Sequence, residues 1–178
     1  LDGVPRCTKA QSAAGSCPLA SRIGSVTALA GQSSVPGQFA GNVYLSDAPT
    51  NDALAGLFID VPVQVGPIYL DDLQITASLI LRPDYGVDVV SAIPETVRGL
   101  QLDQQQLKLI FDRANFLTNP PTCSGNVVSG AFESALGSKK TASAPLNVTG
   151  CDQLEFNPSI AFSASPASAK SSRKSMTS

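Results

Sequence analysis

The sequence contains no histidine and no tryptophan, a single methionine and few charged residues. Without histidine, a Ser-His-Asp or Cys-His site is excluded, and so is acid–base catalysis by histidine. The lack of tryptophan disfavours a carbohydrate site, which usually presents flat aromatic faces, and the three tyrosines are few enough to be core or turn residues. No apolar run is long enough to cross a bilayer. These absences remove the commonest hydrolase machinery and predict no membrane span.

The charge is small and unevenly distributed. The formal net charge is -2, yet Lys170, Arg173 and Lys174 lie in a C-terminal tail that has no acidic residue. The body of the chain is therefore acidic. A nucleic-acid partner requires a basic stripe that displaces counterions from phosphates, so we expect none. We also expect no cofactor.

The four cysteines form two separated pairs, Cys7 with Cys17 and Cys123 with Cys151. They lack the close CxxC spacing of a Cys-only zinc site, and no histidine is present for a mixed one. Disulfides are therefore the better interpretation, with buried free thiols in a cytosolic protein as the alternative. Of the possible connectivities we predict the local one, because each pair brackets a segment that reads as a closed unit. Such bonds indicate an oxidising compartment, hence an extracellular or cell-surface location.

One short helix is predicted near the N-terminus, where Thr8 can cap a turn over residues 9–14 that stops at Gly15. From residue 21 onward, apolar and polar residues alternate with the period of two that is typical of strands. In the first strand, Ile23, Ser25, Thr27 and Leu29 are expected to face one way. In the strand over residues 57–65, one face is expected to carry the apolar residues Leu57, Ile59, Val61, Val63 and Val65, alternating with Phe58, Asp60, Pro62 and Gln64. Pro62 and Pro67 predict that this strand is an edge strand or carries a bulge.

Two hairpins follow from the turn chemistry. Residues 83–86 join strands over 74–82 and 87–93, and Gly137 with Ser138 joins strands over 128–132 and 142–148. Roughly eight to ten short strands predict an all-β fold, a two-sheet β-sandwich or jelly roll with a short disulfide-stapled N-terminal helical turn. We expect residues 1–163 to form this module and residues 164–178 to be a Ser/Ala/Lys-rich tail or the start of a following unit.

Paired carboxylates are the remaining route to catalysis. The pairs are Asp71 with Asp72, Asp84 with Asp88, and Asp152 with Glu155. Each pair also reads as acids at a turn or strand end, so we expect no catalytic residues and no enzyme.

Oxygen ligands for calcium occur in two places, Asp47 with Asn51 and Asp52, and Asp71 with Asp72. No EF-hand pattern is present, and loop acids commonly satisfy turns, so we predict no metal and retain Asp71 and Asp72 as the calcium candidates. A glycosylation sequon begins at Asn147.

Several ordered segments resemble a repeated extracellular module of long secreted proteins from actinobacteria and related bacteria. The resemblance covers about nine tenths of the chain. It is carried by Cys7 to Cys17 with residues 18–26, and by the segments 41–45, 92–94, 99–100, 111–113, 116–120, 122–123, 150–154 and 156–158. It implies an architecture and no assigned chemistry, and it implies that the chain is cut from a longer protein between two junctions.

The resemblance and the strand pattern together predict a structural or assembly module of a bacterial surface stalk or filament. It would polymerise by β-strand addition, with Ile160 and Phe162 as apolar anchors of a docking strand and other copies or neighbouring modules as partners. The alternative is an adhesin or glycan-binding module with its site in the loops at 47–52 or 84–85, stabilised by calcium.

Overall fold

The computed structural model describes residues 3–31, 34–118, 120 and 122–150. Contacts divide the chain into two compact units, Leu1–Thr118 and Asn119–Ser178. Strands make up 53% and helices 6% of the described residues, so the predicted all-β class is confirmed. The boundary expected between residues 163 and 164 lies outside the described residues.

The first unit begins with the predicted stapled helix. Helix α1 (Lys9–Ala13) carries a capping box, in which the Thr8 hydroxyl accepts from the Gln11 N–H and the Gln11 side chain accepts from the Thr8 N–H. Gly15 follows with φ 61°, the left-handed conformation that glycine adopts readily after a helix. Cys7 and Cys17 form a disulfide across this segment with a Cα–Cα distance of 5.2 Å, and the 3-10 turn η1 (Leu19–Ser21) leads into the sheet.

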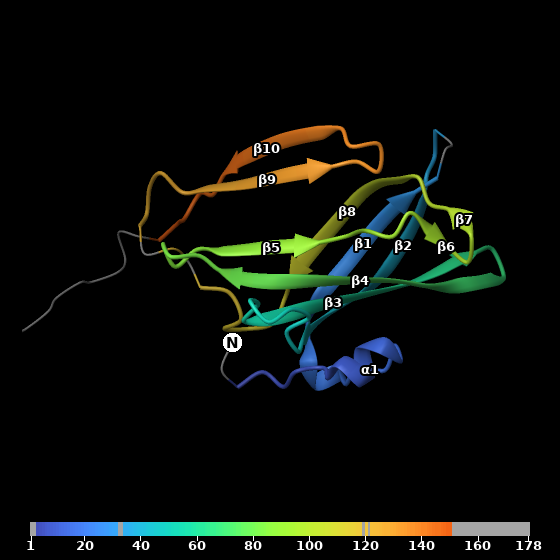
Figure 1. Ribbon diagram of the computed structural model, residues 1–178, viewed down its shortest axis with the longest axis horizontal. Coiled ribbons are helices and arrows are strands. Elements are labelled where there is room, and N and C mark those ends of the chain that lie inside the picture. The colour runs from blue at the N-terminus through green and yellow to red at the C-terminus, as the bar shows by residue number, and fades with distance from the viewer. Residues whose placement is uncertain (1–2, 32–33, 119, 121, 151–178) are drawn as a thin grey trace, which may run out of the picture. The chain divides into compact units, whose positions relative to one another are not determined.

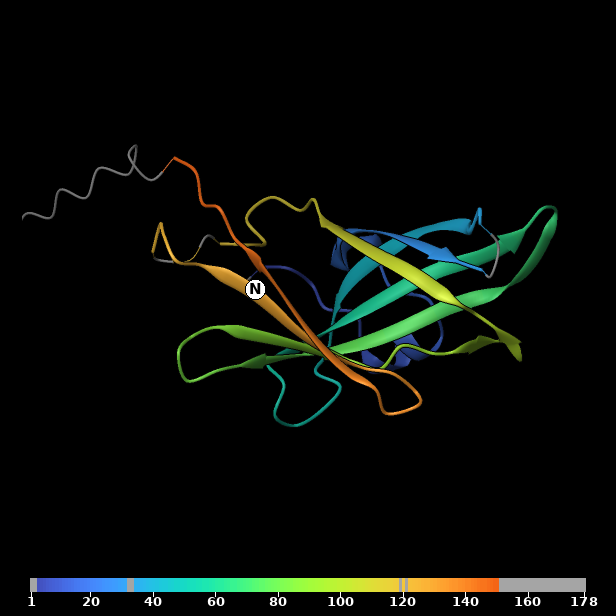
Figure 2. The same ribbon diagram turned by 90° about the horizontal axis from the view of Figure 1, so that it is seen from above.

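A curled, six-stranded antiparallel sheet dominates this unit, as Figures 1 and 2 show. Its order is β5-β4-β3-β2-β1-β8. The strands are β1 (Arg22–Ala30), β2 (Gly37–Ser46), β3 (Ala55–Val65), β4 (Ile68–Leu81), β5 (Val87–Ser91) and β8 (Gln104–Phe111). The predicted hairpin of β4 and β5 is confirmed, with Ala77–Ser91 and Leu81–Val87 among its cross-strand pairs. β5 and β8 are the two edges.

The core lies on one face of this sheet, which we call the core face. The alternation predicted for β3 places Leu57, Ile59, Val61 and Val63 there, each at most 3% exposed. Neighbouring strands bury further apolar side chains in the same cluster, namely Val26, Ala28, Val43, Leu45, Leu73, Ile75, Ala77 and Leu79. The opposite face, which we call the outer face, buries Tyr44 and Phe58 with ring centroids 6.4 Å apart.

In β1, Ile23 was predicted to lie on the same face of the sheet as Ser25, Thr27 and Leu29. This prediction is wrong. Ile23 is fully buried, and Val26 and Ala28 are buried as well, whereas Ser25, Thr27 and Leu29 are only partly buried. The reason is an irregularity between Arg22 and Gly24 in the pairing with β2, which shifts the alternation between Ile23 and the rest of the strand.

The edge position considered for the strand with Pro62 is wrong, and the bulge is confirmed. β3 lies between β2 and β4, and its pairing with β4 shifts between Val63 and Gln64. Pairing with β2 ends at Asn42 and Asp60, so the missing N–H of Pro62 falls beyond that ladder. A proline is thus accommodated in a central strand.

A short two-stranded ribbon, β6 (Thr96–Val97) with β7 (Leu100–Gln101), connects β5 to β8. Val97 is 5% exposed and joins the core cluster. The next two residues, Arg98 and Gly99, both have positive φ and form the turn of the ribbon.

In the second unit, β9 (Val127–Glu133) and β10 (Lys139–Pro145) form the second predicted hairpin. Val128 pairs with Ala144 and Phe132 with Lys140, and the turn contains Gly137 with φ 78°. Every residue of β10 is exposed.

Candidate functional site

The edge strand β5 is the candidate functional surface of the first unit. All five of its residues are exposed, and Val87, Val89 and Val90 are 52%, 57% and 56% exposed. Edge strands of soluble proteins are usually short, charged or covered, because their free backbone groups can pair with another chain. β5 is short, but its composition is mostly apolar, so it is poorly protected against pairing.

The hydrogen bonds of the β4–β5 hairpin determine which backbone N–H and C=O groups of β5 point toward β4 and which point away. The Arg82 N–H donates to the Gly86 carbonyl at 2.8 Å, and hydrogen-bonded pairs recur at every second residue of an antiparallel ladder. The backbone N–H and C=O groups of Asp88 and Val90 therefore bond to β4. Val87, Val89 and Ser91 direct their N–H and C=O groups away from the sheet, toward any added strand.

The opposite edge, β8, has the same arrangement. The Asp112 N–H donates to the Ile23 carbonyl at 3.2 Å. Because hydrogen-bonded pairs recur at every second residue, the backbone groups of Ile110 and Lys108 also point toward β1. Leu107, Leu109 and Phe111 direct their backbone groups outward. Their side chains are partly buried and pack against the core cluster, unlike those of β5.

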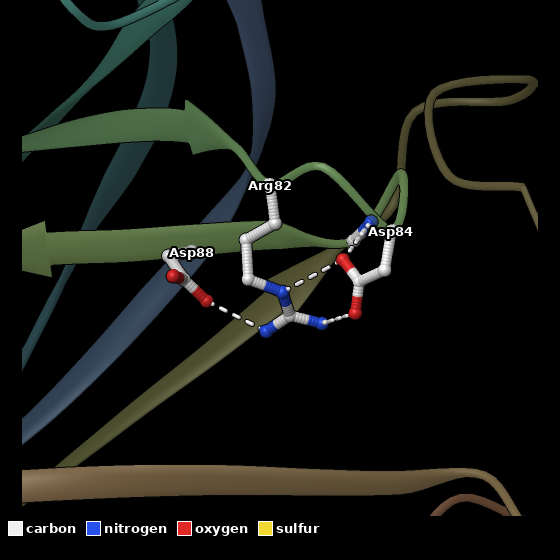
Figure 3. Close-up of polar contacts among 4 residues, drawn as sticks. Arg82, Asp84 and Asp88 are labelled. Carbon is white, nitrogen blue, oxygen red and sulfur yellow. Dashed lines mark hydrogen bonds and ion pairs between the residues drawn. The ribbon is translucent and has the colours of Figure 1, made fainter.

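Figure 3 shows how one arginine holds the turn beside the β5 edge. Arg82 bonds Asp84 through Nε and a second guanidinium nitrogen at 3.0 and 3.2 Å, and Asp88 through the third at 2.8 Å. The hydrogen bonds from Arg82 and from the Gly86 N–H lower the pKa of Asp84. This pair of carboxylates therefore forms an ionic clamp on a turn and is not a free acid–base pair.

Two details of this turn were not predicted. Arg82 was not a candidate, although an arginine two residues before one aspartate and six before another was visible in the sequence. Tyr85, at the tip, has φ 64° and is 87% exposed, so the clamp presents a tyrosine ring to solvent.

The calcium candidates Asp71 and Asp72 point to opposite sides of β4. Asp71 pairs with Val63 of the core face and binds Arg98 at 2.8 Å, which lowers the pKa of Asp71. Asp72 lies on the outer face, where the Tyr69 hydroxyl hydrogen-bonds to it and the pKa of Tyr69 rises to about 12. The two carboxylates thus do not converge on a common ligand.

The other predicted loop, with Asp47, Asn51 and Asp52, connects β2 to β3. The Asp47 N–H donates to the Cys7 carbonyl at 2.9 Å, while Asn51 and Asp52 are exposed. Within the described ranges, no group of three or more Cys, Asp and Glu side chains is placed to hold a metal ion.

A polar row crosses the outer face of the sheet. Arg22 donates to Asn42 at 2.9 Å and binds Asp112 through two nitrogens, each at 3.0 Å. Beside Asn42, Asp60 has one carboxylate oxygen that is buried without a hydrogen-bond partner. Burial and then the charge of Asp72 raise the pKa of Asp60. No sequence signal marked Asp60, because it becomes buried only when three strands assemble.

The predicted pairing of Cys7 with Cys17 is confirmed. Cys123 is also disulfide-bonded, and its predicted partner Cys151 lies outside the described residues, as do Asp152, Glu155, Ile160 and Phe162. Asn147 is exposed just after β10, so the sequon is accessible in this unit.

In the part of the chain that the structure describes, neither helix has the length and hydropathy required to cross a membrane. Comparison with family models, with curated proteins and with solved structures finds no match to this chain.

Proposed function

We propose that this chain is a structural or assembly module of a secreted bacterial surface stalk or filament, and that it polymerises by β-strand addition. The observation that carries the proposal is the β5 edge, with three valines more than half exposed and outward backbone groups at Val87, Val89 and Ser91. Strand addition satisfies such groups and buries the apolar side chains beside them. The proposal requires no catalytic residue and no cofactor.

Two further features support this role. The Cys7–Cys17 disulfide, with Cys123 also disulfide-bonded, fits an oxidising location such as the cell surface. The carboxylates Asp71, Asp84 and Asp88 are paired with arginines, so these acids are occupied in surface ion pairs and need no other role. The bacterial surface setting itself comes from the sequence resemblance.

The C-terminal segment with Ile160 and Phe162, for which the sequence predicts a strand, is the proposed donor. The two side chains are spaced to fall on one face of an extended strand, and residues 156–169 carry no charge. A donor of this kind would add to an open sheet edge of another copy.

Light scattering of the full chain, against a chain ending at Asn157, tests this proposal. We expect assemblies from the full chain whose mass grows with concentration. A full-length variant with Ile160→Asp and Phe162→Asp separates loss of the anchors from loss of length.

The variant Val89→Pro tests the acceptor, because it removes an N–H that points away from β4 and leaves the hairpin ladder intact. A melting curve confirms that the variant remains folded. If the unaltered chain stays monomeric at all accessible concentrations, the proposal is wrong.

The adhesin alternative is favoured by one observation, the ring of Tyr85 held in solvent by the Arg82 clamp. An exposed aromatic ring on a rigid turn suits contact with a sugar or a protein. Binding would raise the melting temperature by mass action on addition of calcium or oligosaccharides. Tyr85→Ala should then abolish a sugar shift. A chain that no ligand stabilises contradicts this alternative.

A further inference from the structure

We infer that copies of this chain join through the two edges of their own sheets, with β5 of one copy against β8 of the next. The inference rests on the proposed assembly function and names the surfaces that make the contact. It needs no segment beyond the described strands, so it differs from addition of the C-terminal strand.

The strand directions permit this pairing. All neighbours in the six-stranded sheet are antiparallel, so the two edge strands β5 and β8 run in opposite directions. A second copy placed beside the first by translation across the strands therefore sets its β8 antiparallel to β5. The core faces of both sheets then lie on the same side.

The backbone groups also match. Val87 and Val89 of β5, and Leu107 and Leu109 of β8, direct their N–H and C=O groups outward. Pairing Val87 with Leu109 and Val89 with Leu107 makes both of them hydrogen-bonded pairs. The apolar side chains of all four residues lie on the core face. There the contact buries the side chains of Val87 and Val89, which are exposed within their own unit.

The same register joins opposite charges on the outer face. Asp88 lies between Val87 and Val89, and Lys108 lies between Leu107 and Leu109, so the two face each other across the contact. Lys108 is exposed, and no carboxylate of the described residues lies within ion-pair distance of it. Asp88 binds Arg82 through one oxygen, Oδ1. The contact therefore gives Lys108 an acidic partner.

This contact uses two different surfaces, so it propagates from copy to copy. Heterologous contacts give open filaments, or rings where the rotation closes. The curl of the sheet, visible in Figure 2, rotates each copy relative to the last. The expected products are twisted filaments or closed rings with a continuous sheet.

Charge reversal in the full chain tests the contact. Asp88→Lys or Lys108→Asp alone puts like charges opposite each other, and we expect each to weaken self-association about fivefold or more. Combining both reversals restores the opposite pair and should recover most of the association. Lys140→Asp on the β9–β10 hairpin is the matched control and should leave association unchanged. Sedimentation velocity at several concentrations gives the association constants, and melting curves exclude unfolded variants.

Cysteine cross-linking tests the register. Asp88→Cys with Lys108→Cys occupies a non-hydrogen-bonded pair, where a Cα separation of about 4.5 Å suits a disulfide. We expect a ladder of covalent oligomers under mild oxidation, and slower cross-linking from Asp88→Cys with Ile110→Cys. Faster linking at position 110 would overturn the stated register.

The outcomes separate the two proposals. If the chain assembles but is insensitive to both charge reversals and forms no covalent ladder, the edge contact is wrong and the assembly function stands. If the unaltered chain does not assemble at all, the assembly function is wrong and the edge contact falls with it.

Discussion

The substitution Cys17→Ala, which removes the Cys7–Cys17 disulfide, should lower the free energy of unfolding of the first unit. Cys7 is the poorer position to change, because its side chain is fully buried and its backbone bonds to Leu45 and Asp47 at 2.8 and 2.9 Å. Cys17 is only partly buried. Its replacement therefore removes the cross-link with little loss of packing.

The magnitude follows from the loop that the bond closes. With a sequence separation of 10, the chain-entropy model gives a loss of about 2.7 kcal/mol in the free energy of unfolding at 25 °C. Helix α1 has five residues, well below the roughly 12 to 15 that an isolated helix needs, so it should fray once it is released.

Urea titration followed by tyrosine fluorescence measures this loss. The chain has no tryptophan, and its three tyrosines, Tyr44, Tyr69 and Tyr85, all lie in the first unit, so the signal reports that unit alone. A loss below about 1 kcal/mol would refute the loop-entropy reasoning.

A double-mutant cycle tests the second half of the argument. Thr8→Ala removes the helix cap and should cost about 1 kcal/mol in the stapled chain, but far less in the Cys17→Ala chain, where the helix is already frayed. Equal costs in both backgrounds would show that the helix survives without its staple.

Three further predictions concern the sheet. Ile75→Ala empties a site that is 1% exposed and should cost about 2 to 5 kcal/mol in urea titration, whereas Ile110→Ala, at 46% exposed, should cost less than about 1 kcal/mol. The pKa of Asp60 is raised, so the folded state holds its proton more tightly and this residue's contribution to stability falls as pH rises above 3.8. Asp60→Asn should therefore raise the free energy of unfolding at neutral pH, and this gain should disappear in acid. A difference between variant and unaltered chain that does not depend on pH would contradict this. Tyr69 should ionise at a pKa of about 12 in an absorbance titration, and Asp72→Asn should bring that pKa back toward 10.0; an unchanged value would place the cause elsewhere.

Local patterns predicted the elements that depend on nearby residues. The cap at Thr8 and the stop at Gly15 marked helix α1, and the turn over residues 83–86 marked the β4–β5 hairpin. The alternation in β3 identified its buried face, because period two is set by the strand itself. These features require no knowledge of the neighbouring strands.

The candidate site was predicted less well, since its chemistry depends on strand pairing. Adjacent carboxylates at Asp71 and Asp72 suggested a shared ligand, but consecutive strand residues point to opposite faces, and each finds its own partner in Arg98 and Tyr69. Asp84 and Asp88 suggested acid–base chemistry, but Arg82 binds both carboxylates across a turn only a few residues long.

The sequence by itself determined the class of this protein: an all-β chain with a stapled N-terminal helix, local hairpins and no histidine chemistry. Only the tertiary structure decided that β1 lies between β2 and β8, that Pro62 belongs to a central strand, and that β5 and β8 are left as edges. Residue patterns within a strand report which face is buried, but strand order and register depend on contacts between residues far apart in the chain. For that reason the two edges, on which the assembly proposals rest, became visible only when the sheet was complete.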